Sequence, residues 1–139
     1  MALVLALGLL GGCGNQEEDY CQALEADQEA FAAMQQDTSG LGLLRQRPLL
    51  QRLADNAPDD LADEWQTLTG ALDAFSDTLE EVGVDPEDFE AGTPPDSLSD
   101  ADRSRIEEAA DELSSADVVA AANGIEQQAK DVCKLQLGL

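Results

Sequence analysis

The chain has 139 residues, which is enough for one domain with a buried core and too few for two. Thirty acidic residues against seven basic ones give a net charge of -23, and there is no histidine. A surface of this sign repels nucleic acid and anionic lipid head groups. The missing histidine excludes Ser-His-Asp and Cys-His nucleophile systems, and any zinc or haem site that contains histidine.

The first distinctive segment is the apolar stretch over residues 2–10, followed by Gly11, Gly12 and Cys13. A stretch this short cannot span a bilayer about 30 Å thick as a helix. Followed by small residues, it is typical of a cleaved export signal. The run Leu10-Gly11-Gly12-Cys13 resembles the lipobox of bacterial lipoproteins, in which the preceding peptide is removed and the cysteine thiol is diacylated.

This resemblance predicts a signal peptide over residues 1–12, a lipidated Cys13 with a short tether to residue 19, and an acidic helical domain over residues 20–139. Two or more acyl chains anchor a protein stably where one does not. Export signals begin with basic residues, yet none precedes Cys13, so we expect the true start to lie further upstream. The alternative is a buried apolar element in which Cys13 is an ordinary core thiol.

The first half of the domain has a helical pattern. A first helix is expected over residues 17–36, ended by Thr38-Ser39-Gly40, and a short helix follows with Pro48 in its first turn. Asp59 and Asp60 suit the positive N-terminal end of the next helix. That helix has apolar residues with 4-3 spacing over three heptads, which is typical of a bundle seam: Leu61, Trp65, Leu68, Leu72, Phe75, Leu79 and Val82.

The second half continues the helical pattern. Gly83 ends the heptad helix, and residues 84–98 are expected to form a loop with a single turn near Phe89. Ser99 and Asp102 predict a capping box for a further helix, which Ser114-Ser115 interrupts. Helical spacing then resumes with Val118, Ala122, Ile125, Ala129 and Val132. The sequence therefore predicts an all-α, up-down bundle of about four long helices and one short helix.

Two cysteines remain, Cys21 near the start of the first helix and Cys133 near the end of the last. Outside the cytoplasm an even pair of this kind is expected to form a disulfide, whereas in a reducing compartment both would be core thiols. A bond between them requires the two chain ends to meet at one pole of the bundle. Four long helices achieve this if Ser114-Ser115 is a true turn. A continuous last helix remains an alternative, with the Pro48 helix supplying the extra reversal.

Motifs for chemistry are missing. There is no CxxC pair, no glycine-rich phosphate loop and no EF-hand pattern, although oxygen ligands crowd between Asp96 and Asp102. We therefore predict no catalytic, cofactor-binding or metal-binding residues. Sixteen acids and no base lie between residues 53 and 102, just after Arg45, Arg47 and Arg52. This stretch is either a solvated surface or an acidic face for cations or a cationic partner.

Beyond the lipobox, most of residues 13–134 resembles a group of small, uncharacterised actinobacterial lipoproteins. The likeness is carried by Asp19-Tyr20-Cys21, by residues 57–65 with Trp65, by Gly83-Val84-Asp85-Pro86 and by Asp131-Val132-Cys133. It implies a lipid-anchored helical domain at the outer face of the cytoplasmic membrane with its early and late cysteines paired. No established activity of that group carries over to this chain.

Three classes of function follow, in order of preference. The first is a non-enzymatic binding or interaction module that is held at the membrane by its lipid and binds a protein, a cell-wall component or a small ligand. The second is a cation or cationic-solute binder that uses the acidic face. The third is an enzyme that works through carboxylates, although thirty acids supply chance carboxylate pairs throughout the chain.

Overall fold

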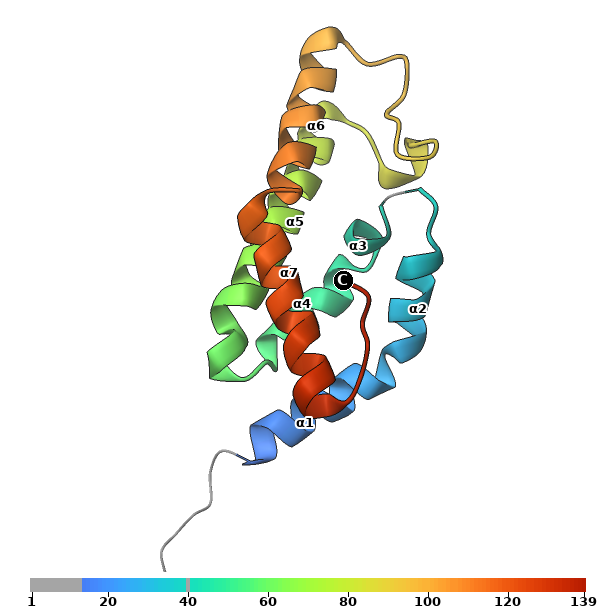
Figure 1. Ribbon diagram of the computed structural model, residues 1–139. Coiled ribbons are helices and arrows are strands. Elements are labelled where there is room, and N and C mark those ends of the chain that lie inside the picture. The colour runs from blue at the N-terminus through green and yellow to red at the C-terminus, as the bar shows by residue number, and fades with distance from the viewer. Residues whose placement is uncertain (1–13, 40) are drawn as a thin grey trace, which may run out of the picture.

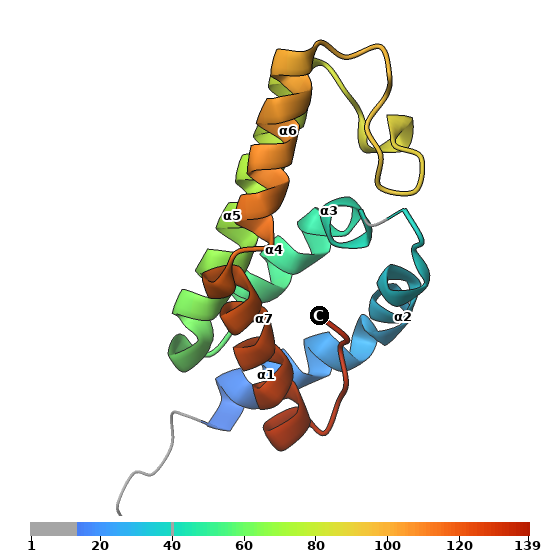
Figure 2. The same ribbon diagram turned by 45° about the horizontal axis from the view of Figure 1, so that its top comes forward.

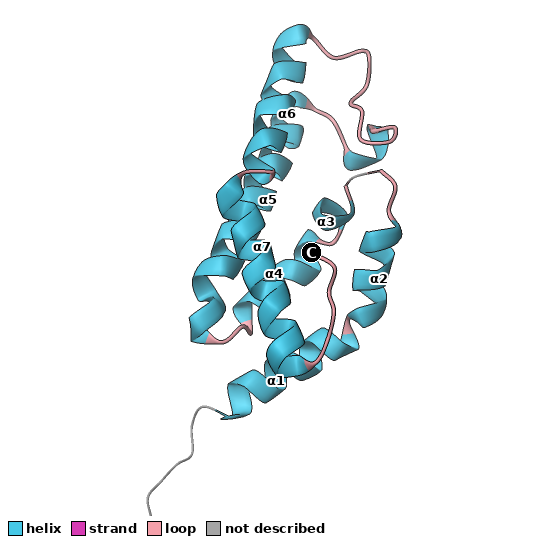
Figure 3. Cartoon of the chain, in the orientation of Figure 1, coloured by secondary structure: helices cyan, strands magenta, loops and turns pink. Residues whose placement is uncertain are grey.

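The computed structural model describes residues 14–39 and 41–139 (Figure 1). Within these residues the elements are helices, joined by turns and loops, with one isolated bridge between Glu90 and Thr93 (Figure 3). The predicted all-α class and helical bundle are confirmed. The chain runs up, down, up and down, and its last helix returns to the end of the bundle where the first begins (Figures 1 and 2).

The first helical run is divided into α1 (Gly14–Ala26) and α2 (Gln28–Gln36) rather than one helix over residues 17–36. The break is at Asp27, whose carboxylate bonds Arg52 of α4 at 2.9 Å. A further difference lies at the start, where α1 begins at Gly14. The residues expected to form an extended tether, 14–19, are therefore helical.

The chain then returns through two short helices, α3 (Gly42–Arg45) and α4 (Arg47–Asp55). Pro48 lies in the first turn of α4, as predicted, where its missing N–H leaves no intrahelical bond unmade. Leu49, Leu50 and Leu53 turn inward from α4 and are buried. Leu44 of α3 is also buried.

The longest helix is α5 (Ala62–Val82), which follows a 3₁₀ turn over Asp59–Leu61. Its predicted heptad seam is confirmed because every position from Leu61 to Leu79 in that series is buried. Gly83 ends the helix with a left-handed φ of 74°, a conformation that favours glycine. The loop that follows contains the expected single turn, over Pro86–Asp88, next to a buried Phe89.

The last helical run consists of α6 (Asp100–Leu113) and α7 (Ala116–Gln128). The Ser99 hydroxyl caps α6 by accepting the N–H of Asp102 at 3.1 Å, as predicted. The turn expected at Ser114-Ser115 is wrong, because α7 continues along α5 in the direction of α6 (Figures 1 and 2). Arg105 of α6 pairs with Glu81 near the end of α5, and Gly124 of α7 lies against Glu64 near its start.

The Ser114-Ser115 interruption is thus a bend between two stacked helices. The reversal that the disulfide needs comes instead from α3 and α4, which is the alternative left open above. After α7, a π-helical turn over Ala129–Cys133 brings Cys133 to Cys21 of α1. The two residues form the predicted disulfide, with their Cα atoms 5.1 Å apart.

The final residues, 134–139, fold back between α7 and α2 (Figure 2). Leu137 is fully buried there. The Glu126 carboxylate accepts the backbone N–H of Leu137 at 3.0 Å and of Gly138 at 2.8 Å. From the other side, the Gln35 amide donates to the Leu137 carbonyl at 2.9 Å. The tail therefore completes the hydrophobic core instead of extending the last helix.

The core has two adjoining parts. The larger is centred on Trp65 and Tyr20 and receives side chains from α1, α2, α4, α5, α7 and the tail. Within it the Trp65 indole N–H donates to the Tyr20 hydroxyl at 2.8 Å, and the two rings meet edge to face. The smaller part gathers Phe75, Leu79, Phe89 and Ile106 at the far end of α5.

Candidate functional site

Of the residues predicted to be functional from the sequence, Cys13 lies outside the described residues, directly before α1. Cys21 and Cys133 are joined, as predicted, and serve the fold. Among residues 14–39 and 41–139, no helix combines the length and apolar character needed to cross a membrane. None of these three residues forms a binding site within the described residues.

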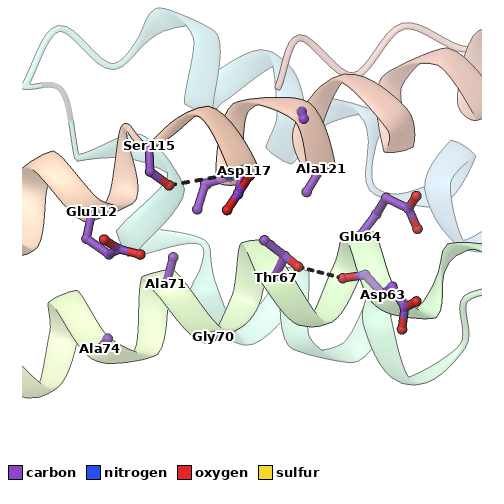
Figure 4. A pocket seen from close by; sticks show the side chains of 12 residues that line it. Asp63, Glu64, Thr67, Gly70, Ala71, Ala74, Glu112, Ser115, Asp117 and Ala121 are labelled. Atoms are coloured by element: carbon purple, nitrogen blue, oxygen red, sulfur yellow. Dashed lines mark hydrogen bonds between the residues drawn. The ribbon is translucent and has the colours of Figure 1, made fainter.

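A groove of about 640 Å³ lies between α5 and the α6–α7 run (Figure 4). A second hollow of about 340 Å³ continues it along α6 and shares Ala71, Ala74 and Glu112 with it. We call the two together the acidic groove. The first hollow is lined by Asp63, Glu64, Thr67, Gly70, Ala71, Ala74, Glu112, Ser115, Asp117, Val118, Ala120 and Ala121.

The groove has a narrow floor because the facing side chains are small. On α5 they are Gly70, Ala71 and Ala74, and on α7 they are Ala120 and Ala121. The heptad seam of α5 turns its large side chains into the core, so this small-residue face is left on the side of the helix that meets α6 and α7. The bend at Ser114-Ser115 lies beside the groove, between Glu112 and Asp117.

Every titratable side chain of the first hollow is acidic: Asp63, Glu64, Glu112 and Asp117. None of the four forms an ion pair with another described residue. All seven bases of the chain bond other groups, and Arg105, which pairs with Glu81, lines the second hollow. Five pair with a carboxylate, while Arg103 and Lys134 donate to the carbonyls of Pro95 and Asp131; the five are Arg45, Arg47, Arg52, Arg105 and Lys130.

The helix dipole stabilises or destabilises each of these carboxylates according to its position on the helix. Asp63, Glu64 and Asp117 lie in the first turns of α5 and α7, where a negative charge is favourable at the positive end of the helix dipole. Glu112 lies in the last turn of α6, where the dipole disfavours it. Three of the four charges thus have a structural benefit, and Glu112 has none.

The first hollow of the groove is lined by four carboxylates and two hydroxyls. Its two hydroxyls already have roles, since Thr67 donates to the Asp63 carbonyl at 2.8 Å and Ser115 accepts the Val118 N–H at 3.4 Å. Within the described residues no cluster of acidic or cysteine side chains has the geometry of a metal site. The oxygens near Asp96 are partly used as well, because Ser99 and Asp102 bond each other at 2.7 Å.

Outside the groove, the pKa values of Tyr20 and Glu126 are shifted. Burial raises the pKa of Tyr20 to about 12, although the Trp65 hydrogen bond opposes the shift. Burial alone would raise the pKa of Glu126, but the N–H of Gly138, the Lys130 ammonium and the N–H of Leu137 outweigh it and hold that pKa below its ordinary value. Both groups join distant segments of the chain, so their ionisation is linked to stability.

Sequence reasoning placed the acidic face between residues 53 and 102, and it missed the groove. Asp63 and Glu64 belong to that stretch, whereas Glu112 and Asp117 come from α6 and α7. The available signal was the set of small residues at helical spacing on α5, Thr67, Gly70, Ala71 and Ala74, next to the apolar seam. This set marks a helix face that no large side chain of the same helix fills.

Comparisons with known proteins assign no function to the groove. No family model matches the chain, and neither a curated protein nor a solved structure is significantly similar to it. The functional argument therefore depends on the geometry and charge of the groove itself.

Proposed function

We propose that this chain is a lipid-anchored, non-enzymatic binding module at the extracytoplasmic face of a membrane, and that its acidic groove binds a cationic ligand. The proposal narrows the two preferred classes of function to one surface. Cys13 would carry the lipid. The bundle would supply a rigid scaffold that the Cys21–Cys133 disulfide closes, and the ligand would lie between α5 and α6–α7.

The observation that carries the proposal is the set of four carboxylates around one hollow with no basic partner. Carboxylates held near one another on rigid helices produce a negative potential that attracts cations, and the low dielectric of the adjoining protein strengthens it. The ion pairs of the described residues involve six other carboxylates, so many acids outside the groove are unpaired too, but these four gather around one hollow. A ligand that supplies positive charge would therefore gain most at this groove.

Support for the anchor comes from the sequence pattern before Cys13 and from the start of α1 at Gly14, which would hold the domain close to the lipid. The mass of the protein extracted from its native membrane tests this part. We expect an N-terminus at Cys13 with added diacylglyceryl mass, and no free thiol until the disulfide is reduced. A mature protein that retains residues 1–12 without lipid would refute the anchor.

Calorimetric titration with spermine tests the ligand class. We expect saturable binding that weakens between about 10 and 100 mM salt, because the screening length falls from about 30 Å to about 10 Å. A groove variant that removes four charges should lose most of this binding: Asp63→Asn, Glu64→Gln, Glu112→Gln and Asp117→Asn.

A matched control variant changes the same number of charges at exposed positions away from the groove: Glu18→Gln, Glu25→Gln, Glu87→Gln and Glu107→Gln. It has the same net charge as the groove variant, so it measures the effect of the overall field. We expect it to bind spermine almost as well as the unmodified chain. Equal loss in both variants would show that general charge attracts the cation, and it would refute the groove as the site.

A further inference from the structure

We infer that the last helical turn, Ala129–Cys133, is a redox-sensitive switch of helix register. While the Cys21–Cys133 disulfide is closed, the turn is π-helical and Cys133 packs against the core. After reduction the turn becomes α-helical and directs Val132 into the core instead, which releases the tail, residues 134–139. The switch lies at the end of α7 and does not depend on the acidic groove.

The turn contains one residue more than the α-helical pattern of this run accommodates. Ile125 and Ala129 are fully buried, and an α-helix would place Val132 on the same face, as its spacing in the sequence predicts. In the structure Val132 is instead 41% exposed, and Cys133 packs against the larger core. The π-helical turn, in which the Lys134 N–H donates to the Ala129 carbonyl, produces this shift by one residue.

The disulfide requires the π-helical register. The Cα atoms of Cys21 and Cys133 are 5.1 Å apart, within the distance that a disulfide can bridge. One residue of an α-helix turns the chain by about 100°, so an α-helical turn would carry Cys133 that far around the helix axis and away from Cys21. The bond therefore holds the turn in a rare form that the apolar spacing of the helix does not favour.

The two registers bury different apolar side chains. In the observed register the tail turns back between α7 and α2, with Leu137 fully buried and Val132 exposed (Figure 2). In the α-helical register Val132 is buried, and the chain leaves the helix in another direction, so Leu137 does not reach its site. The tail then exchanges its hydrogen bonds with Glu126 and Gln35 for bonds to water. Lys134 also leaves a left-handed φ of 60°, which is unfavourable for a residue with a side chain.

The trigger is thiol–disulfide exchange with a dithiol. One thiolate of the dithiol attacks a sulfur of the Cys21–Cys133 bond and forms a mixed disulfide, which its second thiol then resolves. Two electrons and two protons pass to the protein, which gains two thiols, while the dithiol becomes a disulfide. Both cysteines are partly exposed, as attack by an external thiolate requires. One covalent bond thus selects between two packings of the same chain segment.

Val132→Ser tests the register directly. In the oxidised protein the substitution changes an exposed side chain, and valine and serine have similar helix propensities, so stability should be unchanged. In the reduced protein it removes an apolar side chain from the core. The equilibrium with dithiothreitol should therefore shift about tenfold or more toward the disulfide form. Mass spectrometry after alkylation measures the two forms in full-length proteins that carry Cys13→Ser, so that only the pair exchanges.

Val119→Ser is the matched control. Val119 lies on α7 before the turn and is 50% exposed, so it stays exposed in both registers. We expect its equilibrium with dithiothreitol to equal that of the protein with both valines. Equal equilibria in all three proteins would overturn the switch. Loss of helical circular dichroism on reduction would also overturn it, because the reduced chain must remain folded.

Hydrogen exchange measures the release of the tail. The N–H groups of Leu137 and Gly138, which donate to Glu126 in the oxidised protein, should exchange about tenfold or more faster after reduction. In reduced Val132→Ser they should exchange more slowly than in the reduced protein with Val132, because the α-helical register is less stable there. General loosening by reduction would have the opposite effect. Unchanged exchange at Leu137 after reduction would overturn the replacement of Leu137 by Val132.

Discussion

The two sides of this bundle differ in how their acidic side chains are paired with bases. On the side formed by α2, α3 and α4, acids are paired with bases: Asp27 with Arg52 at 2.9 Å, Asp37 with Arg45 at 3.0 Å and Asp73 with Arg47 at 3.4 Å. On the side formed by α5 and α6–α7, Arg105 pairs with Glu81 and Lys130 with Glu126, but the four groove carboxylates have no basic partner among the described residues. Most of the other unpaired acids are spread over the surface, whereas these four gather around one hollow.

The paired side chains connect helices to one another, whereas the groove carboxylates form no ion pair within the described residues. The three arginines that cluster in the sequence at residues 45–52 each reach a different segment, so they tie α2, α4 and α5 together. Single exposed pairs of this kind contribute about 0 to 1 kcal/mol each. The four groove carboxylates contribute no such ties, and Gly70 and Glu112 are unfavourable for the helices that hold them.

The largest effect on stability is expected from breaking the disulfide that links α1 to the last helical turn. Reducing the Cys21–Cys133 disulfide, or replacing both residues by serine, releases a loop with a sequence separation of 112 residues. In the chain-entropy model this lowers the free energy of unfolding by about 4 to 5 kcal/mol. Urea denaturation with and without reductant measures it. A change below about 1 kcal/mol would show that helix packing alone holds α1 against the last turn.

The buried pair in the larger core gives the next effect. Because the pKa of Tyr20 is raised to about 12 in the fold, its proton is held more tightly there than in the unfolded chain. Its contribution is fully present below about pH 10 and is lost as pH rises to about 12, a fall of about 2 to 3 kcal/mol. Tyr20 is the sole tyrosine, so its ultraviolet absorbance follows this ionisation directly.

A Tyr20→Phe variant is the control for that titration. It leaves the Trp65 N–H without its acceptor, so it should be less stable at pH 7 by about 1 to 3 kcal/mol. It also lacks the ionisable group, so its stability should fall less than that of the unmodified protein between pH 10 and pH 12. Parallel pH profiles for the two proteins would contradict the buried position of Tyr20.

A smaller effect on stability is expected from the hydrogen bonds that hold the C-terminal tail, residues 134–139. Glu126→Gln removes the charge that binds the N–H groups of Leu137 and Gly138, and it should destabilise the fold by about 1 to 2 kcal/mol at pH 7. Since the pKa of Glu126 is lowered in the fold, its contribution is present above the pKa of the unfolded chain. It is lost as the pH falls through the lower folded value.

Hydrogen exchange at Leu137 and Gly138 measures this release of the tail. Glu107→Gln is the matched control, because Glu107 is exposed and forms no hydrogen bond or ion pair with another described residue. We expect its exchange rates at the tail to equal those of the unmodified protein. Slow exchange at Leu137 in Glu126→Gln would show that burial of the leucine side chain alone holds the tail in place.

Much of the fold follows from local patterns in the sequence. Heptad spacing identified the buried face of α5, Pro48 and Ser99 marked helix starts, and the cysteine pair linked the chain ends. The break at Asp27 was not predicted, since its Arg52 partner lies 25 residues away. The tail was missed because Leu137 has no periodic neighbours and its backbone is bound by Glu126, which lies on α7.

The direction of α7 shows the same limit. A serine that caps the next helix is compatible with either a reversal or a bend, and only packing decides between them. Here α5 offers a continuous face from Glu81 to Glu64, and α6 and α7 cover it in turn. The groove arises beside that bend, so it depended on a contact between distant helices that helical spacing alone does not encode.

The smallest effect on stability is expected from reversing one charge in the groove. Glu112→Lys places a base at the negative end of α6 among three unpaired carboxylates, so it should raise the free energy of unfolding by about 0.5 to 1 kcal/mol at low salt. Glu107→Lys makes the same change of charge on the same helix outside the groove and should do less. If Glu112→Lys also abolishes spermine binding, then Glu112 lowers the stability of the fold but is needed for the ligand. Such a trade of stability for function is common at binding sites.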